Sequence, residues 1–138
     1  MKDLTMKNYL LALLLLSGLS AQAPAATFSS NLEGDYECTG TDEEHPNMVF
    51  KGEMVIKKTG QTYSVNSSFS DNASYIGTGI YDKKKRTIAL VFVNSQNTKE
   101  TGISVMNIQE NGAMTTDWTY LNRTTIGHST CTAKKGTA

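Results

Sequence analysis

Residues Ser74–Asn94 read SYIGTGIYDKKKRTIALVFVN and decide the fold that we predict for this chain. The stretch contains two β-rich runs joined by the short charged turn Asp82–Arg86. The second run, Ile88–Val93, has no polar residue and is rich in β-branched and aromatic types. Such a run predicts a strand at the centre of a core, and the two runs together predict a β-hairpin.

The segments on either side predict further hairpins of the same sheet. Met48–Lys57 alternates apolar with charged side chains, which is the period of a half-buried strand. Asn111-Gly112 predicts a hairpin turn with positive φ at both residues. In Thr101–Gln109 the apolar side chains switch from odd-numbered positions, Ile103 and Val105, to even-numbered positions, Met106 and Ile108. This switch predicts a β-bulge near Ser104–Met106. Besides the opening hairpin, the predicted strands are Gly34–Gly40, Met48–Lys57, Thr62–Phe69, Thr101–Gln109, Met114–Tyr120 and Ile126–Ala133.

The first 25 residues predict a Sec-type signal peptide. Lys2 and Lys7 give a basic start, Tyr9–Leu16 is an apolar run too short to span a membrane as a mature helix, and residues 23–25 fit the cleavage rule. The alternative is an N-terminal membrane anchor. We therefore expect a single mature domain, residues 26–138, that is periplasmic or secreted and has no transmembrane segment.

The chain has two cysteines, Cys38 and Cys131, which lie on the first and last predicted strands. An even cysteine count in an exported chain indicates a disulfide, the alternative being two buried thiols. In an open meander these strands lie several spacings of about 4.8 Å apart, whereas a disulfide needs Cα atoms within about 7 Å. A bridge within one chain therefore makes the two strands neighbours. We predict an all-β fold, an eight-stranded antiparallel up-and-down meander closed into a small barrel.

Four glycines recur every 25 residues, at Gly52, Gly77, Gly102 and Gly127. Each lies within or near the start of an even-numbered predicted strand. Glycine inside a strand marks a bend, a bulge or a close backbone approach, which a tightly coiled barrel requires. The alternative is coincidence among the 11 glycines of the chain.

Eight short strands in meander order, opened by Gly34-Asp35-Tyr36, resemble the small calycin-type barrels, above all the avidin-like ones. This resemblance covers the mature chain as architecture. Avidins line their pocket with several tryptophans, whereas this chain has Trp118 alone.

Tyr36-Glu37-Cys38 with the late Cys131 also resembles periplasmic inhibitors of c-type lysozyme, which are exported, disulfide-closed barrels. That resemblance implies inhibition of a secreted enzyme. The stretch nearest to their Ser-x-Gly-x-x-Tyr inhibitory motif is Ser70–Gly79, which differs from it.

The sequence contains no pattern typical of an enzyme. No serine stands in a Gly-x-Ser-x-Gly elbow, and no Cys–His pair is free once the cysteines are bridged. His45 follows three acidic residues, which we interpret as a solvated loop rather than a cation site. His128 is three residues from Cys131 on the same predicted strand, so the two side chains point to opposite faces. We therefore expect His128 at the surface. We predict no catalytic residue, no metal and no cofactor.

Charge balances over the chain, with 13 basic and 13 acidic residues, but its distribution is uneven. In a meander, alternate loops share one end of the barrel. One end then gathers Lys57, Lys58, Lys83, Lys84, Lys85, Arg86, Lys134 and Lys135, and the other gathers Asp42, Glu43, Glu44, Asp71 and Glu100. The first six cations are candidate anion-binding residues for an anionic partner. The alternative is that turn lysines keep the hairpin ends soluble.

These observations predict a non-enzymatic exported binding protein that uses the barrel mouth and its loops to hold an unidentified small molecule or protein. Trp118 alternates with Met114 and Tyr120 on one face of its strand, so we expect its ring to face the core. The alternatives are an inhibitor of a secreted enzyme such as lysozyme, and a structural or self-associating envelope protein.

Overall fold

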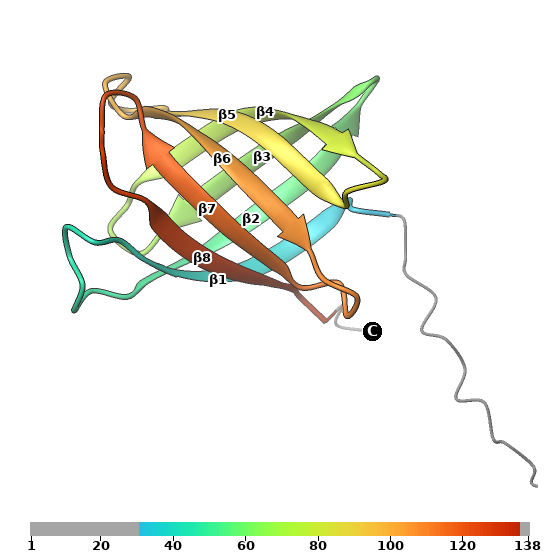
Figure 1. Cartoon of the computed structure of the whole chain (residues 1–138), viewed down its shortest axis with the longest axis horizontal. Helices are drawn as coiled ribbons and strands as arrows, with labels where there is room; N and C mark the ends of the chain where they lie inside the picture. The colour runs from blue at the N-terminus through green and yellow to red at the C-terminus, as the bar shows by residue number, and fades with distance from the viewer. Residues whose placement is uncertain (1–30, 136–138) are drawn as a thin grey trace, which may run out of the picture.

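The structure, a computed structural model, describes residues 31–135 (Figure 1). Eight antiparallel strands close into a barrel in sequence order, which confirms the predicted fold class. The strands are β1 Gly34–Thr41, β2 Phe50–Thr59, β3 Thr62–Phe69, β4 Ser74–Asp82, β5 Thr87–Asn94, β6 Thr101–Ile108, β7 Met114–Tyr120 and β8 Gly127–Ala133. The predicted signal peptide lies outside the described residues. Within residues 31–135, no helix is long and apolar enough to cross a membrane.

Strands β1 and β8 pair with each other, and the predicted disulfide joins them. Cys38 lies opposite Cys131 in the register, and their Cα atoms are 4.1 Å apart. This separation suits a directly opposed antiparallel pair, whose side chains point to the same face. Both cysteines are buried inside the barrel. Closure pairs the two strands that would otherwise be exposed edges.

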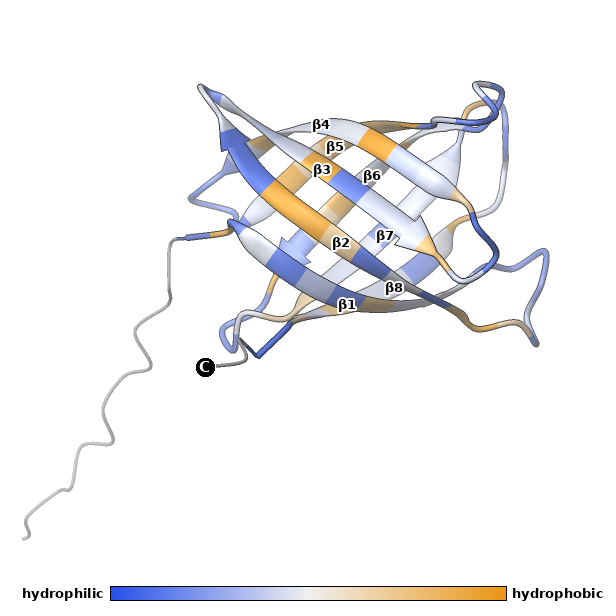
Figure 2. Cartoon of the chain, turned by 180° about the vertical axis from the view of Figure 1, so that it is seen from behind, coloured by the Kyte–Doolittle hydropathy of each residue, from blue (hydrophilic) through white to orange (hydrophobic). Residues whose placement is uncertain are grey.

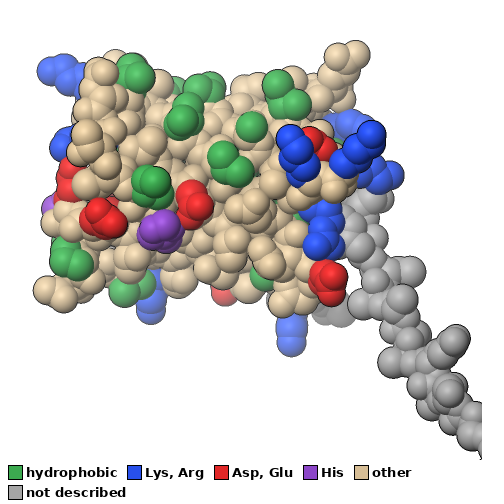
Figure 3. Space-filling model, viewed as in Figure 1, with side chains coloured by type: hydrophobic (Ala, Val, Ile, Leu, Met, Phe, Trp, Pro, Cys, Tyr) green, Lys and Arg blue, Asp and Glu red, His purple; other side chains and the backbone are tan. Residues whose placement is uncertain are grey.

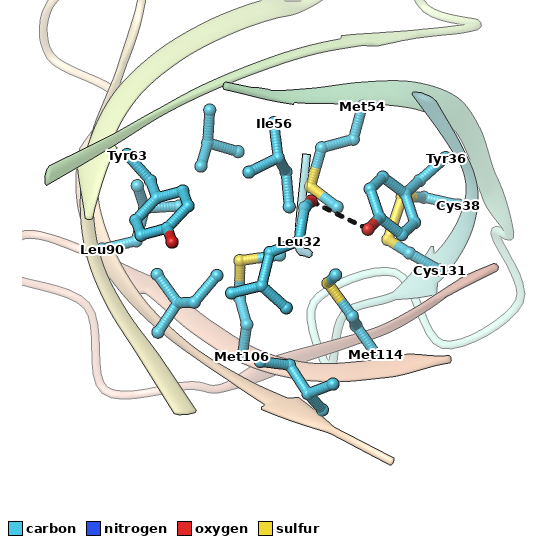
Figure 4. Close-up of a cluster of buried hydrophobic side chains, with 13 residues drawn as sticks. Leu32, Tyr36, Cys38, Met54, Ile56, Tyr63, Leu90, Met106, Met114 and Cys131 are labelled. Carbon is cyan, nitrogen blue, oxygen red and sulfur yellow. Dashed lines mark hydrogen bonds between the residues drawn. A yellow bond between two sulfur atoms is a disulfide. The ribbon is translucent and has the colours of Figure 1, made fainter. Parts of the chain in front are cut away.

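One end of the barrel is filled by a packed apolar core (Figure 4). Ile56, Ile88, Met106 and Met114 are completely buried there. Leu32, in the segment that leads into β1, lies across this end of the lumen and is buried as well. The Tyr36 hydroxyl donates a hydrogen bond of 2.9 Å to the Leu32 carbonyl oxygen, which fixes that segment in place. We call this the closed end.

The four periodic glycines lie on the even-numbered strands and make room for large side chains inside the barrel. A Cβ atom at Gly52 would stand 2.5 Å from Phe69 Cδ1, and one at Gly102 would stand 2.5 Å from Phe92 Cζ. Aromatic side chains of neighbouring strands therefore lie directly over these glycines, an arrangement known to stabilise glycines in sheets. The glycine period predicted close approach correctly.

Two predictions about strand faces are wrong. The apolar run of β5 is not buried on both sides: Ile88 and Leu90 are buried, whereas Ala89 and Val91 are exposed on the outer face. Strand β6 has no bulge, because its pairing with β5 and β7 is continuous. Its inner face carries Gly102, Ser104, Met106 and Ile108. The apolar residues at odd-numbered positions of this strand therefore lie on the outer face, and those at even-numbered positions lie on the inner face. Figure 2 shows the banding of hydropathy along the strands.

The turn between β6 and β7 is a hairpin, as predicted, but of another type. Gly112 has a φ of 82°, whereas Asn111 is not among the residues with positive φ. The Gly112 amide donates to the Gln109 carbonyl oxygen, and the Gln109 amide donates to that of Ala113. The connection is therefore longer than the two-residue turn expected, and only its glycine needs the left-handed conformation.

Candidate functional site

The half of the lumen away from the closed end contains a cavity of about 590 Å³. Its mouth is framed by the four loops of that end, residues 42–49, 70–73, 95–100 and 121–126, each of which contributes to the lining. Its deepest walls are apolar and consist of Met54, Val65, Leu90, Met106 and the disulfide. A cavity of this volume is within the range that holds a small organic ligand.

Aromatic side chains surround the cavity near its mouth. We call Phe69, Tyr75, Phe92, Trp118 and Tyr120 the aromatic rim. The Tyr75 ring is central, with ring centroids 5.9 Å from Phe69 and 5.6 Å from Phe92 in edge-to-face contacts. The Trp118 and Tyr120 centroids are 5.4 Å apart. Such contacts stabilise one another by roughly 0.5–1.5 kcal/mol per pair, so the rim is an ordered wall.

Glu100 is held beside the rim by three hydrogen-bond donors. The Asn94 side-chain amide donates to Oε2 at 2.7 Å, the Tyr75 hydroxyl donates to Oε2 at 3.0 Å, and the Asn97 amide donates to Oε1 at 3.0 Å. These bonds, the one from Asn94 foremost, lower the pKa of Glu100 although partial burial opposes them. Glu100 is therefore a fixed carboxylate at neutral pH.

The two rim tyrosines are neutral hydrogen-bonding groups. The Tyr75 and Tyr120 hydroxyl oxygens are 2.6 Å apart. Burial raises the pKa of both hydroxyls, and for Tyr75 the hydrogen bond to Tyr120 raises it further. Both groups stay protonated near neutral pH, so the network joins Glu100 to Tyr120 through Tyr75.

Between the rim and the apolar floor, the inner face of four strands carries the hydroxyl side chains Ser67, Ser104, Thr116 and Ser129. Ser104 and Thr116 are buried. The Thr116 hydroxyl oxygen has no hydrogen-bond partner among the described residues. A buried polar group without a partner is costly, so this hydroxyl offers a ready contact to a molecule in the cavity.

Trp118 faces the lumen, as predicted, and lines the cavity. It is only half-buried, because its ring borders the open half of the barrel rather than the packed core. A Cβ atom at Gly127 would lie 2.2 Å from the indole atoms Cε2 and Cζ2. The indole therefore rests directly on the backbone of β8.

The predicted basic residues gather at the end opposite to the cavity. Figure 3 shows lysine and arginine side chains concentrated over the closed end. The meander brings the β2–β3 and β4–β5 turns together there, and Lys57, Lys58, Lys83, Lys84 and Lys85 are exposed. Asp82 accepts hydrogen bonds from the backbone amides of Lys84 and Lys85, so this turn is structured. Anion binding at this end stays a prediction.

Neither histidine lies inside the barrel. His45 is an exposed residue of the mouth, and its Nδ1 atom is 3.1 Å from Asp42 Oδ1. His128 is on the outer surface, as predicted, with Nδ1 2.7 Å from Asp117 Oδ1. In the part of the chain that the structure describes, no cluster of His, Cys, Asp and Glu could hold a metal ion.

The rim tyrosines, Phe92 and the role of Glu100 were not predicted from the sequence. A signal for the rim was present, because Phe69, Tyr75, Phe92 and Tyr120 each lie close to a loop of the same barrel end. A meander necessarily brings these strand ends together. The hydrogen bond that links Glu100 to the rim carries no comparable signal, because its donor Tyr75 is 25 residues away.

No family model matches the chain, and no curated protein matches it. Among solved structures, the fold is similar to a redesigned beta barrel, mFAP1, bound to DFHBI, with a TM-score of 0.59 and 14% identity over 79% of this chain and 98% of that chain. EF1p2_mFAP2b bound to DFHBI is similar with a TM-score of 0.55 and 9% identity over 80% and 99%. At these identities the likeness shows the small β-barrel fold alone. The avidin-like resemblance stays an expectation.

Proposed function

We propose that this protein is a non-enzymatic, exported binding protein that holds a small amphipathic molecule in the open half of its barrel. The observation that carries the proposal is the cavity of about 590 Å³, with an apolar floor, an aromatic rim and a few polar groups. This combination is typical of small-molecule sites, in which apolar walls provide affinity and a few polar groups set orientation. Solved barrels of similar fold, described as bound to DFHBI, support it by analogy.

The architecture supports a preformed site. The disulfide ties β1 to β8 beside the cavity, and the completely buried side chains of the closed end prevent the barrel from collapsing inward. A rigid cavity binds with a smaller loss of conformational freedom than one that must first open.

The non-enzymatic part of the proposal is motivated by the sequence, in which no serine stands in a Gly-x-Ser-x-Gly elbow.

Fluorescence titration with the neutral dye N-phenyl-1-naphthylamine tests the proposal. Ser67 lines the cavity, whereas the next residue, Ser68, is exposed on the outer face of β3. Saturable binding is expected for the wild type and for Ser68→Phe, and binding about tenfold weaker for Ser67→Phe, whose ring occupies the cavity. Circular dichroism checks that both variants fold. Absence of saturable binding by the wild type, or equal binding by both variants, contradicts the proposal.

A second candidate function, self-association, is favoured by the outer face of β4, β5 and β6. Ile80, Val91, Ile103 and Val105 are exposed there, and they lie in adjacent rows of the register. Large exposed apolar patches mark interaction surfaces. On β4, β5 and β6 the outward side chains of these two rows carry no charge, so the patch is compatible with a second copy of itself; Asp117 of β7, opposite Val105, borders it.

Sedimentation equilibrium tests self-association. Val91→Lys should abolish any dimer, whereas Thr115→Lys, on the outer face of β7, should leave it intact. A wild-type protein that remains monomeric at high concentration rules this candidate out.

A further inference from the structure

The charges around the cavity are mostly negative. Its lining includes the carboxylates of Asp42, Glu44, Asp71 and Glu100 and the cations Lys99 and Arg123. Arg123 Nη1 is 2.9 Å from Glu44 Oε1, so this pair is internally balanced. The remaining three carboxylates then outnumber the exposed Lys99, with His45 beside Asp42 carrying charge only when protonated.

This negative charge reaches the aromatic rim. Glu100 is the carboxylate fixed nearest to the rim, through its bonds to Tyr75 and Asn94. Burial raises the pKa of the Tyr120 hydroxyl, the hydrogen bond to Tyr75 opposes this, and the charges of Glu100, Asp42 and Asp71 raise it further. The rim tyrosine thus lies in the field of three carboxylates. A cation placed there would be attracted, and an anion repelled.

Aromatic rings add to this preference. The faces of Trp, Tyr and Phe rings carry negative electrostatic potential and attract cations, most strongly where water is excluded. The rim supplies five such rings around the same opening as the carboxylates. Below it, the unpartnered Thr116 hydroxyl and the apolar floor suit the body of a longer molecule.

Building on the proposed function, we propose that the cavity selects an amphipathic organic cation. Its ammonium group would lie in the cavity beside Glu100 and against the rings of the aromatic rim, and its hydrocarbon body would extend past Thr116 toward Leu90 and Met106. The binding reaction involves no covalent change.

Three octyl compounds of different charge test this proposal: octyltrimethylammonium, 1-octanol and octanoate. Their binding is followed through the fluorescence of Trp118, the one tryptophan of the chain. At low ionic strength the cation should bind about tenfold more tightly than the alcohol, and the carboxylate more weakly than both. Added salt should reduce the difference.

Glu100→Gln should lower the affinity for the cation about five- to tenfold and leave that for 1-octanol nearly unchanged. Glu110→Gln is the matched control, because it removes the same charge from the turn between β6 and β7 at the closed end. Asp71→Asn, which keeps an acceptor for the Ala73 amide, serves as a second cavity variant should Glu100→Gln fail to fold.

The outcomes separate the two proposals. If 1-octanol or octanoate binds as tightly as the cation, the charge preference is wrong while a small-molecule site remains. If the cavity variants and Glu110→Gln weaken cation binding equally, net charge rather than the cavity is responsible, and the inference is wrong. If none of the three compounds and no neutral dye binds, the binding function itself is wrong.

Discussion

Replacing Gly127 with alanine perturbs the contact that positions Trp118. Gly127 is paired with Trp118 in the register of β7 and β8, and an added Cβ atom would lie 2.2 Å from two indole carbons. Carbon atoms in contact are about 3.5–4.0 Å apart, so the ring must move by roughly 1.3 Å or more. Because β8 backbone lies behind the contact, the ring is expected to shift into the cavity.

The expected magnitude follows from two opposing effects. Overpacking costs about 1–3 kcal/mol, whereas alanine in place of glycine stabilises by about 0.4–1 kcal/mol through the unfolded chain. We expect Gly127→Ala to lower the free energy of unfolding by about 1–2 kcal/mol. In a Trp118→Ala background no ring is displaced, so the same change should be neutral or slightly stabilising. The coupling energy between the two substitutions is therefore about 2 kcal/mol.

Urea unfolding of the four proteins of this cycle, followed by far-ultraviolet circular dichroism, measures the coupling. That signal serves all four because it does not depend on Trp118. Trp118→Ala alone should cost about 2 kcal/mol, less than a fully buried tryptophan, because its ring is half-buried. A coupling energy below about 0.5 kcal/mol would refute the reasoning, since it would mean that the indole does not rest on Gly127.

Three further predictions concern the disulfide, acid stability and the basic end. Replacing both Cys38 and Cys131 with serine should lower the free energy of unfolding by about 3–5 kcal/mol, because the disulfide closes a loop with a sequence separation of 93 residues. A loss below about 1 kcal/mol in urea unfolding would contradict this prediction. The pKa of Glu100 is lowered on folding, so its contribution to stability is present above its ordinary value of 4.5 and is lost as the pH falls through the lower folded value. Glu100→Gln should therefore reduce the loss of stability between about pH 5 and 3. If the free energy of unfolding falls equally with pH in both proteins, Glu100 is not an ionised, hydrogen-bonded carboxylate. Changing Lys83, Lys84 and Lys85 to glutamine should weaken retention on heparin and reduce the dependence of that retention on salt, with little effect on folding. If the wild type and the triple variant are retained equally and weakly, the lysines serve to keep the hairpin ends soluble rather than to bind an anion.

The strand order and closure could be predicted from the sequence because they depend on local patterns and one geometric constraint. Turn residues and alternation locate most strands, and the positions of Cys38 and Cys131 then require β1 and β8 to be neighbours. Face assignment failed where both faces of a strand are apolar. Ile88–Val93 contains no polar residue, and in Ile103–Ile108 the polar Ser104 points inward, so neither sequence marks the exposed face of its strand.

The cavity was not predictable in the same way. Its volume depends on how far inward-facing side chains from eight strands fill the lumen, which no single segment encodes. The Glu100 network joins Asn94, Tyr75 and Tyr120 across three strands, and it forms only when the register places them at one mouth. The glycine period was the available hint, because it marked where the lumen accommodates large rings.

Intermolecular nuclear Overhauser effects between bound N-phenyl-1-naphthylamine and the protein test most directly whether a small molecule binds inside the barrel. Trp118, Leu90 and Met106 line the cavity, whereas Ile80 and Ile103 are exposed on the outer face. We predict contacts from the dye to the indole of Trp118 and to the methyl groups of Leu90 and Met106, and none to the outer isoleucines. Contacts confined to Ile80 and Ile103, with none inside the cavity, would contradict the account.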